Sequence, residues 1–298
     1  MSSELFGIMF KQKLRSELYG IETQRKLVQK KSLFFVVSGI LIFITCQIFN
    51  RLLGWVVIPL VFFSMFLFWQ VFVMISQWRE DFKKQIIPKV LEILDPNLEL
   101  QDPKIYDKNT IRKSQLIQSN FEDKEVFCDD YITSKSYGNL KIAELKITRQ
   151  LGKNSVKIFG GIIFSAQFPI QFNGRSFAFH KSFAELSNLE GLEKVILESP
   201  RLMEKFNFYT TSQVEARMCF QTDIMSNLLD LCEQYGANFD LSFIDNTIYI
   251  ALHQHQSFFE PNIFQTVFDP KIYQKFYEEI TTLNQIITKF KLEQNLKL

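Results

Sequence analysis

The stretch ESPRLMEKFNFYTTSQVEARMCF, residues 198–220, contains three glutamates and two arginines among aromatic and β-branched residues. In VEARMCF, strand alternation would place Glu215 and Arg217 on the same face, with about 7 Å between their Cα atoms. The arginine fork can then bind Glu215, or Glu198 brought alongside by the preceding turn. We predict a structural salt-bridge cluster of Glu198, Glu215 and Arg217, with ligand binding as the alternative and no catalytic residue.

A buried cluster of this kind makes a prediction about stability. Removing Arg217 would leave a buried carboxylate uncompensated, at a cost of about 3–5 kcal/mol. The structural interpretation therefore predicts that Arg217→Ala severely destabilises the domain. The ligand-binding alternative predicts a stable variant that has lost only its biological activity.

Other residue types that do chemistry give weaker patterns. Two imidazoles, His253 and His255, would share a strand face, but no third ligand follows at a suitable spacing, so we expect no metal site. The Gly160-Gly161 pair lacks the spacing of a phosphate-binding loop and indicates a bulge or a close backbone approach. No GxSxG, HExxH or CxxC motif is present, and no cofactor is expected. The four separated cysteines (Cys46, Cys128, Cys219 and Cys232) are typical of reduced cytoplasmic thiols.

Two apolar runs near the N-terminus are the strongest pattern in the chain. Leu33–Phe49 has 17 residues and can extend to Leu53, and Trp55–Trp78 has 24. A 24-residue helix is about 35 Å long, enough to cross a bilayer core of roughly 30 Å. The soluble alternative, a buried helical hairpin, would need two helices that are apolar on every face. We therefore predict a two-span transmembrane hairpin.

The flanks of these runs predict its orientation. Residues 1–32 carry seven Lys/Arg against three Asp/Glu, Arg79, Lys83 and Lys84 follow the second run, and the short loop has only Arg51. The positive-inside rule places both termini in the cytoplasm and the connecting loop outside. Trp55, Trp78, Arg15, Lys30 and Lys31 are the expected membrane-interface residues. The basic head, residues 1–32, is either an amphipathic helix on anionic lipid or a helical segment packed on the cytoplasmic domain, with bases that serve only topology.

The rest of the chain predicts an α+β cytoplasmic domain, residues 105–298, after a juxtamembrane helix and linker, residues 79–104. The helix is expected to break or kink at Pro88. Turn signals predict an antiparallel β-meander with hairpins at Gly138-Asn139, Asn173-Gly174 and Asp245-Asn246. Residues 191–199, 207–210 and 214–220 are predicted strands, 200–206 and 222–235 are predicted helices, and a long helix is expected at about 270–292.

The blocks VKIFGGIIFSAQF, LESPRLMEKFNFYTTSQVEAR, LSFIDNTIYIAL and FFEPNIFQTVF together resemble the bacterial membrane-protein family known as domain of unknown function (DUF) 3137. The upstream IETQRK and the double-span anchor are also similar to that family's layout. Gly160 stands where the family tends to have a basic residue, and Thr222-Asp223 replaces a Thr-Pro pair. The resemblance implies membrane anchoring and an α+β cytoplasmic domain, with no established activity.

These observations lead to one functional hypothesis. We expect a membrane-anchored cytoplasmic binding module without turnover, whose partners are the bilayer and either another protein or a second copy of the chain. The net charge of +2 gives no general attraction to nucleic acid. The alternative is a membrane-bound enzyme, or a protein that binds a small ligand or lipid headgroup through Glu198, Glu215 and Arg217. A deep pocket with convergent polar groups would favour that alternative.

Overall fold

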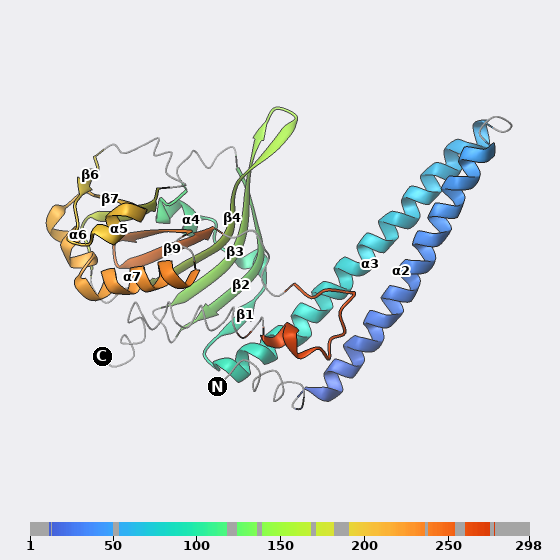
Figure 1. Cartoon of the computed structure of the whole chain (residues 1–298), viewed down its shortest axis with the longest axis horizontal. Coiled ribbons are helices and arrows are strands. Elements are labelled where there is room, and N and C mark those ends of the chain that lie inside the picture. The colour runs from blue at the N-terminus through green and yellow to red at the C-terminus, as the bar shows by residue number, and fades with distance from the viewer. Residues whose placement is uncertain are drawn as a thin grey trace. The chain divides into compact units, whose positions relative to one another are not determined.

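The computed structural model describes most of the chain (Figure 1). The described residues are 12, 14–49, 54–117, 124–135, 139–167, 171–181, 191–235, 238–253, 260–274 and 277. The chain divides into two compact units. Unit 1 contains residues 1–90 and 259–279, and unit 2 contains residues 91–258 and 280–298.

Unit 1 is built on two long helices, α2 (Arg15–Phe49) and α3 (Gly54–Leu94). Their 35 and 41 residues correspond to lengths of about 52 and 61 Å. Helix α2 joins most of the basic head to the first apolar run without a break. Helix α3 continues through Pro88, so the predicted break there is wrong. The fully buried neighbours Ile86, Ile87 and Val90 hold this part of the helix by packing.

The apolar stretches of α2 and α3 leave most of their side chains exposed. Only 6% and 11% of the most apolar 18-residue window of each helix is buried, whereas a core helix of a soluble protein would be mostly covered. Both helices are therefore long and apolar enough to cross a membrane. They approach each other closely at Gly39, where an added Cβ would lie 3.0 Å from the Phe68 ring. Small residues at such contacts let membrane helices pack.

Unit 2 is a nine-stranded antiparallel sheet with the order β1-β2-β3-β4-β9-β8-β5-β7-β6. The strands are β1 (Glu99–Gln101), β2 (Lys124–Ser134), β3 (Leu140–Leu151), β4 (Asn154–Gln167), β5 (Arg175–His180), β6 (Glu193–Val195), β7 (Phe206–Thr210), β8 (Phe239–Ile244) and β9 (Thr247–His253). Short helices connect them: η1 (Pro103–Ile105), α4 (Asn109–Ser114), α5 (Pro200–Lys205), α6 (Gln213–Cys219) and α7 (Thr222–Tyr235). The predicted α+β class, with an antiparallel sheet after two apolar helices, is confirmed.

Two predicted hairpins are confirmed and one is wrong. Strands β2 and β3 pair around Asn139, and β8 and β9 pair around Asp245, both of which have a positive φ. The turn at Asn173-Gly174 joins no hairpin, because β4 pairs with β3 and β9, whereas β5 pairs with β7 and β8. The predicted helices at 200–206 and 222–235 are confirmed as α5 and α7.

The other differences lie at both ends of unit 2. The predicted linker contains β1, which pairs with the end of β2. The predicted strand VEARMCF is α6 instead, because Ser212 caps this helix and its Oγ accepts the Glu215 backbone N–H at 3.4 Å. Residues 270–274 are helical, and the remainder of the predicted long C-terminal helix lies outside the described residues.

Aromatic side chains fill the interior of unit 2. On one sheet face, Phe177, Phe179, Tyr249 and Ile163 pack with Tyr106 and Ile111 from the η1–α4 region. A second group contains Phe206, Phe208 and Phe239 from the strands and Phe220, which follows α6. The sheet therefore has buried side chains on both faces over β4, β9, β8, β5 and β7.

Candidate functional site

The segment 260–274, which follows the last strand, packs in unit 1 against α2 and α3 (Figure 1). We call this segment and its partners on the two helices the clasp. Val267 and Tyr273 of the segment are fully buried, and so on α3 are Trp78 and Phe82, whose rings lie 6.0 Å apart. The Tyr19 and Phe268 rings meet edge to face at 4.9 Å. The clasp therefore has a hydrophobic core of its own.

A buried ion pair on α2 holds the segment by its backbone. Arg25 donates two hydrogen bonds to Glu22, from Nε to Oε2 at 2.9 Å and from Nη2 to Oε1 at 2.7 Å. The third guanidinium nitrogen, Nη1, donates to the Ile263 carbonyl at 2.7 Å, and Glu22 Oε2 accepts the Val267 N–H at 3.1 Å. Both partners are about 95% buried. The pair thus satisfies two backbone groups of the returning segment, which would otherwise need water.

Electrostatics keeps this pair charged and adds a second contact. Burial acts to raise the pKa of Glu22, but the hydrogen bonds from Arg25 and from the Val267 N–H outweigh it and hold the pKa below its usual value. Glu260 lies 3.3 Å from Arg79 and 3.5 Å from Lys83 on α3. These are two of the three bases that the sequence placed just after the second span.

The clasp also bears on the predicted membrane-interface residues. Leu14, Leu18 and Ile21 are buried in unit 1, which favours the protein-packed interpretation of the head over the lipid-bound one. Trp78 is only 2% exposed, so its indole packs against protein. The side chains of Arg15, Lys30 and Lys31 are exposed, and the side chain of Trp55 lies outside the described residues. Interface contacts of these four residues stay a prediction.

The predicted cluster of Glu198, Glu215 and Arg217 is not brought together. Glu215 Oε1 accepts the Asn173 N–H at 3.1 Å, and its Oε2 accepts the Gly174 N–H at 2.6 Å. Arg217 is exposed on α6 and Glu198 is exposed before α5, and neither forms an ion pair with Glu215 in this part of the described chain. A helix replaces the strand on which the expected geometry depended. Whether these residues bind a ligand stays a prediction.

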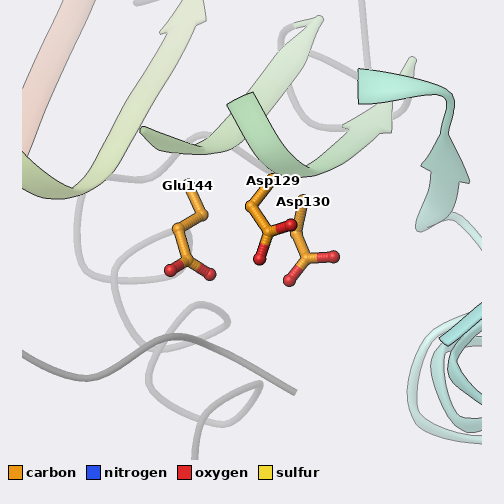
Figure 2. Close-up of side chains that lie close together, drawn as sticks. All are labelled: Asp129, Asp130 and Glu144. Carbon is orange, nitrogen blue, oxygen red and sulfur yellow. The ribbon is translucent and has the colours of Figure 1, made fainter. Parts of the chain in front are cut away.

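A bulge in the β2–β3 pairing gathers three carboxylates that the sequence analysis missed. Cys128 pairs with Leu145 and Tyr131 pairs with Ala143, so Asp129 and Asp130 both lie opposite Glu144. Figure 2 shows the three side chains extending from the two strands in the same direction. One oxygen of each lies within 4.8 Å of the others. Counting back from the hairpin turn places Asp130 opposite Glu144, but only the bulge brings Asp129 beside them, so the full cluster had no signal in the sequence.

Three carboxylates offer oxygen ligands of the type that Ca²⁺ and Mg²⁺ prefer. The three side chains also take part in other interactions, so they do not form an open ligand set. Burial raises the pKa of the neighbouring Cys128 thiol to about 12, and the negative charges of Asp130 and Asp129 add to the rise. The thiol is therefore protonated and unreactive at neutral pH. All four cysteines are free, as the sequence predicted.

A histidine–aspartate pair lies where β9 ends. His253 Nε2 is 2.8 Å from Asp240 Oδ2, and Asp240 Oδ1 accepts the His180 backbone N–H at 2.8 Å. The His253 ring also meets the Phe159 ring edge to face at 5.2 Å. Asp240 is thus used to join three neighbouring strands, β9, β8 and β5. The second histidine of the predicted pair, His255, lies outside the described residues.

These features define the class: an α+β protein with two helices able to cross a membrane and an antiparallel sheet domain. Residues 157–292 match the family described as "Protein of unknown function (DUF3137)", so the resemblance is confirmed over this range. The upstream segments that also suggested it lie outside the matched residues.

Two further comparisons add little. No curated protein matches the chain. Among solved structures, the chain is similar to the mycobacterial trehalose monomycolate transport factor A, TtfA, with 10% identity. The alignment covers 53% of this chain and 75% of that one, with a TM-score of 0.29. A likeness at this level carries no functional argument.

Proposed function

We propose that the protein is a membrane-anchored binding module of a bacterial inner membrane, with α2 and α3 as its two spans and unit 2 in the cytoplasm. The observation that carries the proposal is the contrast along the helix pair. The apolar stretches expose side chains such as Phe34, Phe62 and Phe72, each about two-thirds accessible. The ends of the same helices bury charged and polar groups in the clasp. A bilayer suits the exposed apolar surface, whereas water and protein suit the charged and polar ends, and this contrast supports the proposed anchor.

Orientation follows from charge. Arg79 and Lys83 sit on α3 immediately after the second apolar run, and the first run follows seven bases in residues 1–32. Their concentration at one end of the helix pair supports placing the clasp and both termini on the cytoplasmic side.

Binding without turnover is the second part of the proposal. The polar groups with the best chance of acting chemically are used by the fold: Glu215 holds a turn, Asp240 joins three strands, and Glu22 and Arg25 hold the clasp. We infer that unit 2 presents a surface to another molecule, either a protein partner or a second copy of the chain.

Reporter fusions test the topology. Green fluorescent protein fused after Leu298 should fluoresce, and alkaline phosphatase at the same position should be inactive, because that enzyme folds only in the periplasm. Alkaline phosphatase inserted after Leu53 is the matched control and should be active. The full chain should also remain in the membrane fraction after a carbonate wash. Active phosphatase at Leu298, or complete release by carbonate, would refute the anchor.

A further inference from the structure

The β3–β4 hairpin extends beyond the rest of the sheet (Figure 1). Its strands pair from Lys141↔Ser165 to Leu151↔Asn154, around a two-residue turn in which Gly152 has a φ of 63°. The extended part, residues 146–158, is called the basic hairpin below. Every side chain from Arg149 to Ile158 is exposed. This part of β3 and β4 therefore contributes little to the core of unit 2.

Charge on the basic hairpin has one sign. Lys146, Arg149, Lys153 and Lys157 are the charged residues in 145–161, and all four are exposed. Lys124 on β2 lies directly opposite Arg149, and Glu125 lies opposite Thr148. Like charges placed opposite each other in a sheet are destabilising. The exposed charges of residues 145–161 are all positive and are therefore complementary to an anionic surface.

Apolar side chains occupy the same tip. Leu151, Val156 and Ile158 are 53%, 47% and 38% exposed, and Phe127 on β2, opposite Lys146, is 54% exposed. The Lys157 side chain lies over Gly160. A Cβ at residue 160 would overlap the Lys157 side chain, so glycine is needed there to make room for it. Aliphatic side chains flanked by lysines suit the boundary between lipid headgroups and acyl chains. Single-stranded nucleic acid would instead call for aromatic rings on which bases stack.

We propose that the basic hairpin docks on the anionic surface of the bilayer that α2 and α3 cross, with Leu151 and Val156 entering the headgroup layer. The inference rests on the proposed membrane anchor, which keeps unit 2 close to that surface. Helix α3 continues for 16 residues, about 24 Å, past Trp78. The 14 residues of β4 span about 46 Å, which is longer than this stretch of α3.

The expected energetics is electrostatic. Each base brought to an anionic surface should favour the docked state about fivefold, and the effect should fade beyond a Debye length of about 8–10 Å. Four bases therefore make docking depend steeply on lipid charge and on salt.

A spin label at the tip tests the proposal on the full chain. Val156→Cys in a Cys128→Ser background, labelled with a nitroxide, is reconstituted into vesicles of phosphatidylcholine alone or of phosphatidylcholine and phosphatidylglycerol at about 7:3. Collision with oxygen, relative to a water-soluble nickel complex, reports the lipid environment. This ratio should rise several-fold only with the anionic lipid, and it should fall back at about 0.5 M salt.

Two matched variants separate the hairpin from general charge. Changing Lys146, Arg149, Lys153 and Lys157 together to Gln should abolish the rise. Changing Lys104, Lys108, Arg112 and Lys113 to Gln removes the same charge from another exposed part of unit 2 and should leave the rise intact. A loss of docking in the second variant alone would overturn the assignment to the hairpin.

The outcomes also separate this proposal from the anchor. If the protein floats with neutral vesicles after a carbonate wash but the label stays in water in both lipids, the hairpin proposal fails and the anchor stands. If the protein does not float, the proposed function fails and the hairpin proposal falls with it. Lipid exposure that is equal in neutral and anionic vesicles, or that requires added cytosolic protein, would also overturn the anionic-surface assignment.

Discussion

Glu215 shows how a charged residue in a suggestive pattern can serve the backbone. Its two carboxylate oxygens accept the N–H groups of Asn173 and Gly174, at the turn that leads into β5. Gly174 is needed there because a Cβ would lie 2.7 Å from Glu215 Oε2 and 2.6 Å from Thr211 Oγ1. The Glu215 carboxylate and Gly174 therefore depend on each other at this turn, although they are 41 residues apart in sequence.

The contact between Glu215 and the turn at Gly174 makes a prediction about stability. Glu215→Ala should lower the free energy of unfolding by about 1–3 kcal/mol, because two backbone donors lose a charged acceptor. Gly174→Ala should cost a similar amount by displacing the carboxylate. Arg217→Ala, on the exposed face of α6, should change stability by no more than about 0.5 kcal/mol. Thermal unfolding of the detergent-solubilised protein measures all three, and a severe loss in Arg217→Ala would restore the salt-bridge cluster expected from the sequence.

At the scale of elements, local signals were predictable and long-range pairing was not. The turns at Asn139 and Asp245 and the apolar stripe of α7 predicted their elements because each depends on neighbours in sequence. The helix α6 was also within reach, since Ser212 and Glu215 have the spacing of an N-cap box that outweighs the alternation of VEARMCF. The sequence could not predict that β4 and β5 are unpaired. Strand β9 pairs with β4 instead, although it lies 80 or more residues further along the chain.

The clasp was also not predictable, because it joins segments far apart in sequence. Its buried Glu22 makes a prediction about pH. The pKa of Glu22 is lower in the folded protein than its ordinary value of 4.5. Its contribution to stability is therefore complete above pH 4.5 and is lost as the pH falls through the lower folded pKa. At neutral pH, Glu22→Gln should speed hydrogen exchange of the Val267 N–H by about 10- to 100-fold, as expected for a lost bond to a buried charge.

Comparing variants isolates this effect from other carboxylates. The exchange difference between wild type and Glu22→Gln should shrink steadily below pH 4.5. Glu17→Gln is the control, because Glu17 pairs with Lys89 at 2.6 Å while about a third of each side chain is exposed, and surface pairs contribute little. Equal protection of Val267 in wild type and Glu22→Gln at neutral pH would show that the buried pair does not hold the segment.

At the scale of the whole molecule, the chain enters unit 2 from α3 and returns to unit 1 with the segment 260–274. All nine strands lie between Glu99 and His253, so the returning segment adds no strand to the sheet. Its buried residues instead lie in unit 1, together with the buried residues of α2 and α3. The predicted boundary between a transmembrane hairpin that ends at residue 78 and a cytoplasmic part after it would cut through the clasp.

The division into units changes what truncation should do. A fragment of residues 79–298 lacks α2, so Val267 and Tyr273, fully buried in the intact chain, lose Glu22, Arg25 and the apolar face of Leu18 and Ile21. We expect that fragment to expose this surface and to self-associate or adsorb to membranes. A fragment of residues 91–258 keeps every strand without the returning segment, and it should be the more soluble of the two although it is shorter. Size-exclusion chromatography of both fragments at equal concentration distinguishes them, and a monodisperse 79–298 beside an aggregating 91–258 would mean that the returning segment stabilises the sheet domain rather than the anchor.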